Sequence, residues 1–156
     1  MSRIRESCFE VLKTQGSVPG ITIEEAGRAM ANFEVAPVAT VPLDSEETTS
    51  EVNRLWMQHA RSAGVFAADG SFLIATFETE SRTTDWVRVR LGPRTDVSIL
   101  TDDQKRIEFV ARSISGHHIC GVTAEEYDYW VVSLPVDQAA GDFTDRRSRP
   151  RWQRSL

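Results

Sequence analysis

The stretch that decides the fold is DWVRVRLGP, residues 85–93, because the spacing of apolar residues changes there. Apolar residues alternate with Arg88 and Arg90, which is the pattern of a strand with one buried face. Gly92 and Pro93 end this strand. Before this stretch, apolar residues recur at helical spacing, and after it they alternate with polar residues. The sequence therefore predicts helices before this point and strands after it.

Four further short strands are predicted downstream, each closed by turn residues or by a proline. Short connections favour antiparallel pairing, because parallel strands need long crossovers. The expected strands are 97–100, 106–112, 117–122 and 127–134.

Upstream, three segments have the apolar spacing of amphipathic helices. The first covers residues 3–14. Thr22 begins the second, and Glu25 lies three residues on, so the pair predicts a capping box. The third follows residues 43–47, which are polar from Asp44 on, and ends at Gly64, and its buried stripe includes Leu55 and Trp56.

Two other upstream segments have no helical spacing. Residues 34–41 are rich in β-branched side chains and contain Pro37, which predicts an extended edge segment. Residues 65–80 admit two interpretations. Asp69 and Gly70 between apolar runs indicate a hairpin, whereas Ser71 could cap a short helix with Leu73 and Phe77 on one face.

Helices followed by closely spaced strands predict an α+β fold with an antiparallel meander. The chain has 156 residues, which suits one domain, and we assign it to residues 1–136. Residues 137–156 hold five arginines and few large apolar side chains, so they predict a disordered, flexible tail.

Composition narrows the class of protein. The formal net charge of −5 argues against nucleic acid as a partner. There is no apolar run of the roughly 18 residues that a membrane helix needs, and no secretory signal, so we expect a cytoplasmic protein without membrane insertion. Cys8 and Cys120 lie within apolar patterns and are expected to be reduced and buried.

One cluster could carry chemistry, namely His117, His118 and Cys120. A structural zinc site needs four ligands, and His59 is the remaining histidine. A nucleophilic Cys120 would need a base, such as His118, and an oxyanion hole. Because the chain has no nucleotide-binding loop, nucleophile elbow or zinc-protease helix, we predict no catalytic residue, metal or cofactor, and no enzyme.

Seven short stretches of the chain resemble the N-terminal half of the EspG proteins, the cytosolic chaperones of type VII (ESX) secretion. They are ITIEEA at 21–26, APV at 36–38, AGV at 63–65 with DG at 69–70, TDWVRVR at 84–90, FVARS at 109–113 and HIC at 118–120.

The EspG resemblance implies a mixed α/β fold that binds the exposed apolar tip of a PPE protein in a PE–PPE dimer. It also implies a helix at residues 71–80. EspG chains consist of two related halves, whereas the similarity here covers residues 21–136 and one half. A homodimer of this chain could rebuild the two-half arrangement.

We therefore predict a protein-binding chaperone or accessory factor. The turn after residues 96–100 is the expected contact surface, formed by Thr101, Asp102, Asp103, Gln104 and Lys105. Two alternatives stay open. One is a generic interaction or regulatory module whose arginine-rich tail binds an acidic partner, and the other is a small enzyme or ligand binder with a pocket near His117, His118 and Cys120.

Overall fold

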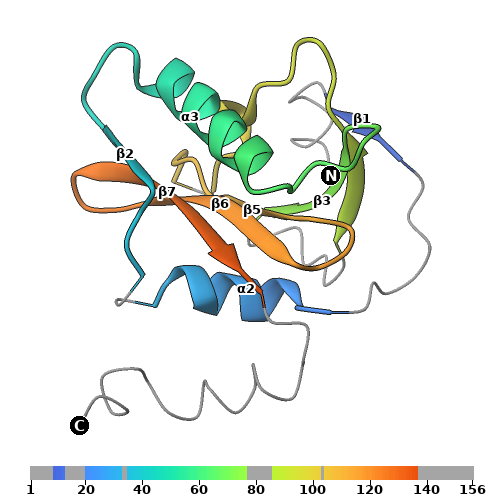
Figure 1. The fold of residues 1–156 in the computed structure, drawn as a ribbon. Coiled ribbons are helices and arrows are strands. Elements are labelled where there is room, and N and C mark those ends of the chain that lie inside the picture. The colour runs from blue at the N-terminus through green and yellow to red at the C-terminus, as the bar shows by residue number, and fades with distance from the viewer. Residues whose placement is uncertain (1–8, 13–19, 33–34, 77–85, 103, 137–156) are drawn as a thin grey trace, which may run out of the picture.

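The computed structural model describes residues 9–12, 20–32, 35–76, 86–102 and 104–136. Within them, a seven-stranded antiparallel sheet carries one helix on each face (Figure 1). This arrangement confirms the predicted α+β class. The predicted tail at 137–156 and Cys8 lie outside the described residues.

The strands follow the order β1-β4-β3-β5-β6-β7-β2 across the sheet. The last three in sequence, β5, β6 and β7, form the expected meander, while the first two in sequence lie at opposite edges. The strands are β1 (Glu10–Val11), β2 (Ala39–Pro42), β3 (Ser71–Thr76), β4 (Val87–Arg90), β5 (Phe109–Arg112), β6 (His118–Ala124) and β7 (Asp128–Pro135).

Helix α3 (Thr48–Ser62) covers one face of the sheet. Val52, Trp56 and Ala60, spaced by four residues, are fully buried. The predicted place of Trp56 in the core is confirmed, whereas Leu55 is half-buried at the margin of the same cluster. The helix ends at Ser62, and the predicted stop residue Gly64 follows with a φ of +78° that glycine adopts without steric cost.

Helix α2 (Ile23–Met30) covers the opposite face. Its predicted capping box is present. The Glu25 amide donates to Thr22 Oγ1 at 3.1 Å, and the Thr22 amide donates to Glu25 Oε1 at 3.3 Å. The helix approaches β6 closely, because a Cβ at Gly121 would lie 2.6 Å from Met30 Sδ.

A buried arginine fixes the segment that enters α2. Arg112 of β5 donates to the Ile21 carbonyl at 3.2 Å and to the carbonyls of Ser113 and Ile114 at 3.2 and 3.4 Å. The Trp86 indole donates to the same Ile21 carbonyl at 3.0 Å. Arg112 also lies over the Trp86 ring at 5.7 Å from its centre. Three segments distant in sequence therefore meet at one backbone carbonyl.

The predicted first helix is wrong for its described part. Residues 10–11 form strand β1, which pairs with β4, and the Leu12 amide donates to the Arg88 carbonyl at 2.8 Å. The edge of β4 that does not pair with β3 offers backbone hydrogen bonds to this segment. Such pairing can override a helical spacing of apolar residues, because strand formation depends on the neighbouring strand. Residues 3–8 and 13–14 of the predicted helix lie outside the described part of the chain.

The helix expected at 71–80 from the EspG resemblance is also wrong. Residues 71–76 form β3, a central strand between β4 and β5, and Ser71 to Ala75 are all buried. A strand buried on both faces shows a continuous apolar run instead of alternation. Residues 77–80 lie outside the described residues.

The strand predicted at 97–100 is a short 3₁₀ turn, η1 (Val97–Ile99). The side chain of Asp96 accepts from the Ser98 amide at 3.0 Å, and Asn53 of α3 accepts from the Val97 amide at 2.9 Å. The side chains of Asp96 and Asn53 therefore accept from backbone amides that, in a strand, would donate to a neighbouring strand. The strand predicted at 106–112 begins only at Phe109, after an isolated bridge between Thr101 and Ile107.

The edge segment predicted at 34–41 is confirmed for β2, whose residues 39–42 pair with β7 at one edge of the sheet. The strands predicted at 86–91, 117–122 and 127–134 correspond to β4, β6 and β7. None of the described helices is long and apolar enough to cross a membrane.

Candidate functional site

The turn predicted to contact a partner is held together by Asp102. Its Oδ1 accepts from the amides of Gln104 and Arg106 at 2.8 and 2.9 Å, and its own amide donates to the Arg106 carbonyl at 2.7 Å. Lys105 takes the left-handed conformation, with φ at +62°. Asp103 lies outside the described residues. Asp102 therefore joins the two sides of the turn.

The side chains that this turn presents to solvent are Gln104 and Lys105, whereas Thr101 and Asp102 are half-buried. The adjoining turn η1 is joined to α3 through Asn53, which also donates to the Thr95 carbonyl at 3.4 Å. The described contact residues thus lie together on one turn, and their contact with a partner stays a prediction.

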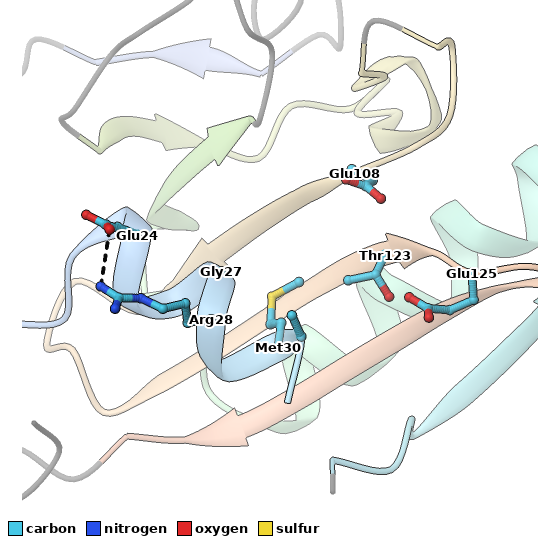
Figure 2. A pocket seen from close by; sticks show the side chains of 8 residues that line it. Glu24, Gly27, Arg28, Met30, Glu108, Thr123 and Glu125 are labelled. Carbon is cyan, nitrogen blue, oxygen red and sulfur yellow. Dashed lines mark ion pairs between the residues drawn. The ribbon is translucent and has the colours of Figure 1, made fainter. Parts of the chain in front are cut away.

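A hollow of about 510 Å³ lies between α2 and the β5–β6 side of the sheet (Figure 2). We call it the α2 hollow. Apolar or small residues of α2 and its end form one wall, and acidic or hydroxyl side chains near β5 and β6 form the other. It is lined by Glu24, Gly27, Arg28, Met30, Ala31, Glu108, Thr123 and Glu125.

Strand alternation explains why these polar groups meet. Val110 and Arg112 of β5 face α2, and Glu108, which directly precedes β5, lines the hollow on that same side. On β6, Thr123 follows Gly121 by two residues and so shares its face. Glu125 begins the next turn, where its amide donates to the Asp128 carbonyl at 2.8 Å.

The two ends of the α2 hollow differ in charge. At one end, Glu24 and Arg28 form an exposed ion pair at 3.3 Å. At the other end, half-burial raises the pKa of Glu108, and the nearby Asp102 carboxylate raises it further. The Ala124 amide, which donates to Glu108, acts in the opposite direction and lowers this pKa. Within the described chain, neither Glu108 nor Glu125 forms an ion pair.

The Thr123 side chain lies at the same end of the hollow as Glu108 and Glu125 (Figure 2). Its Oγ1 is buried and has no hydrogen-bond partner among the described residues. A buried hydroxyl without a partner costs roughly 1–3 kcal/mol. The α2 hollow therefore contains a polar atom that could accept or donate a hydrogen bond.

Replacing Glu108 by glutamine is expected to raise the melting temperature at pH 7. Because the pKa of Glu108 is raised in the folded state, the contribution of Glu108 to stability is present at low pH and is lost as pH rises through the folded-state pKa. Glutamine does not ionise, so Glu108→Gln avoids this loss at pH 7. The difference in melting temperature between the variant and the parent should therefore shrink toward pH 4. Thermal unfolding from pH 4 to 8 measures it, with exposed Glu126→Gln as the control. An advantage that grows on acidification would contradict the expectation.

The alternative site at His117, His118 and Cys120 does not form a reactive pair. Cys120 is fully buried under α3, and burial raises the pKa of its thiol to about 12. His118 Nε2 lies 2.6 Å from Ser133 Oγ, and His117 is exposed. A protonated thiol that no substrate can reach is a poor nucleophile. The described chain also holds no group of three metal-ligating side chains.

Comparisons with known proteins do not place this geometry in a family. No family model matches the chain, and neither the curated proteins nor the solved structures contain a match.

Proposed function

We propose that this chain is a protein-binding chaperone or accessory factor of type VII secretion, which binds a PE–PPE pair. Its contact surface comprises the turn at 101–106 and the α2 hollow beside it. The two are contiguous, because the Glu108 amide donates to the Leu100 carbonyl at 3.0 Å, directly before the turn, and Glu108 lines the hollow.

The observation that carries the proposal is the α2 hollow itself. Its wall from Gly27, Met30 and Ala31 is apolar, and its volume is enough for one or two side chains of another chain. In the neighbouring turn, Asp102 accepts from the amides of Gln104 and Arg106, and Lys105 is left-handed. A surface ordered before binding loses less conformational entropy when a partner arrives, which favours affinity.

The residues of the EspG resemblance also support this proposal. Ile21, Trp86 and Arg112 come from three separate stretches that resemble EspG, and they meet at the Ile21 carbonyl. The resemblance therefore falls on residues that place α2 on the sheet, and α2 forms one wall of the hollow.

The test is capture of a purified PE–PPE pair from the same host by the full chain. Ala31 is exposed and lines the hollow, so Ala31→Arg should fill the hollow without disturbing the core. Ser62→Arg adds the same charge at an exposed position on α3, on the opposite face. We expect Ala31→Arg to weaken binding at least tenfold, and Ser62→Arg to leave it unchanged.

Two results would contradict the proposal in different ways. Failure of the parent chain to bind any PE–PPE pair would reject the type VII role. Equal binding by the parent and Ala31→Arg would reject the α2 hollow as the contact surface.

A further inference from the structure

We propose that the α2 hollow binds one arginine side chain of the partner protein. This inference rests on the proposed function and names the chemistry that the contact surface recognises. It follows from the charge of the hollow, its apolar wall and the placement of its two carboxylates on different segments.

Charge is the first argument. Glu108 and Glu125 line one end of the hollow, and in the described chain neither has an ion-pair partner. The basic side chains nearby are already engaged, since Arg28 pairs with Glu24 and Arg106 pairs with Asp102 at 3.4 Å. A partly desolvated carboxylate gains most from a cation that comes with its own donors.

The shape of the hollow is the second argument. Met30, Ala31 and Gly27 provide an apolar wall on which the methylene stem of a long basic side chain can pack. Figure 2 shows Met30 between the Glu24–Arg28 pair and the group of Glu108, Thr123 and Glu125. A side chain lying along Met30 would therefore bring its charged end to the carboxylates.

A guanidinium fits the hollow better than the ammonium of a lysine does. The hollow offers two carboxylates on different segments, Glu108 before β5 and Glu125 after β6. A guanidinium has five N–H donors in a planar fork and can reach several separate acceptors at once. An ammonium is a compact, strongly hydrated charge and loses more on entering a half-buried site.

The experiment uses the full chain and a capped five-residue peptide, GARAG, followed through the amide signals of Thr123 and Ala124 by NMR. A peptide with citrulline in place of arginine keeps the shape and removes the charge. We expect saturable shifts at these amides with the arginine peptide, and at least fivefold weaker binding with citrulline. Glu125→Gln should weaken arginine binding at least threefold, while its neighbour Glu126→Gln, outside the hollow, should not.

Protonation provides a second readout. A bound guanidinium lowers the pKa of a neighbouring carboxylate, so peptide affinity should rise as pH increases through the Glu108 range. Among the charged groups near Glu108, the carboxylates of Asp102 and Glu125 also attract the guanidinium of the peptide, whereas Arg106 repels it. In Glu108→Gln the pH dependence should be reduced.

Several results would overturn the inference. Equal affinity for the arginine and citrulline peptides would show that charge is not recognised. Equal losses of affinity for the arginine peptide in Glu125→Gln and Glu126→Gln would show the same. A further control replaces the tail arginines by glutamine and adds no peptide. If the amide signals of Thr123 and Ala124 then shift relative to the parent chain, the occupant of the hollow is the chain's own segment and not a partner. Those arginines are 146, 147, 149, 151 and 154.

The inference and the proposed function can fail separately. Capture of a PE–PPE pair that is unaffected by Glu108→Gln and Glu125→Gln would reject arginine recognition and keep the chaperone role. Peptide binding at the hollow without any PE–PPE capture would reject the chaperone role and keep arginine recognition.

Discussion

Replacing Trp56 by alanine is expected to lower the free energy of unfolding by about 4 kcal/mol, in the middle of the range for aromatic truncation in a core. The indole is fully buried, and its ring lies 5.3 to 5.9 Å from those of Phe66, Phe72 and Phe109. It also donates to the Cys120 carbonyl at 3.0 Å. The substitution therefore leaves a cavity and removes a buried hydrogen bond.

Urea denaturation followed by circular dichroism measures this loss. Trp130→Ala is the matched control, because Trp130 is half-buried on the opposite face of the sheet and should cost markedly less. Since Trp56→Ala can fail to fold, Trp56→Phe provides a second variant that keeps most of the volume and loses the indole donor. A decrease below about 1 kcal/mol for Trp56→Ala would contradict the expectation.

Replacing Arg112 by leucine is expected to lower the free energy of unfolding by about 3 kcal/mol. Arg112 is 1% exposed and donates to the carbonyls of Ile21, Ser113 and Ile114. Leucine keeps the apolar contact and removes all of these donors, so buried carbonyls lose partners. We also expect the segment entering α2 to separate from β5, which faster amide exchange in α2 would show.

The matched control is Arg88→Leu on β4, where the arginine is exposed and its loss should change stability by less than about 0.5 kcal/mol. Arg112→Lys tests the geometry, because one ammonium cannot replace a planar guanidinium that reaches three carbonyls. Full stability in both Arg112 variants would show that the Ile21 carbonyl is satisfied by Trp86 alone.

The sequence predicted the fold best where local chemistry and tertiary packing agree. Thr22 and Glu25 cap α2 through their own side chains, and Gly64 ends α3, so neither depends on distant residues. The alternation of β4 was visible because Val87 and Val89 are buried while Arg88 is exposed and Arg90 half-buried.

Prediction failed where a distant neighbour decided the structure. The apolar run in β3 is compatible with a buried helix or a central strand, and only β4 and β5 on either side of it select the strand. Val97 would have suited a strand, but the Asn53 side chain, 44 residues away, accepts its amide hydrogen bond. Patterns within a short window contain no information about such partners.

The α2 hollow was missed for a similar reason. Its residues come from α2, the segment before β5, and the end of β6, which lie far apart in the sequence. One signal was available, because alternation through Val110 and Arg112 places Glu108 on a face that is otherwise covered. A carboxylate at such a position is a reason to look for a site.

The order of strands in the sheet has a consequence for synthesis on the ribosome. Among the described strands, β2 pairs only with β7, about 90 residues later in the chain, and β1 pairs only with β4. Chain growth at about 5–20 residues per second leaves β2 without its partner for several seconds. Since loop closure over such a span is slow, we expect β2 to join the sheet last. During that interval the growing chain presents an unpaired strand to chaperones in its surroundings.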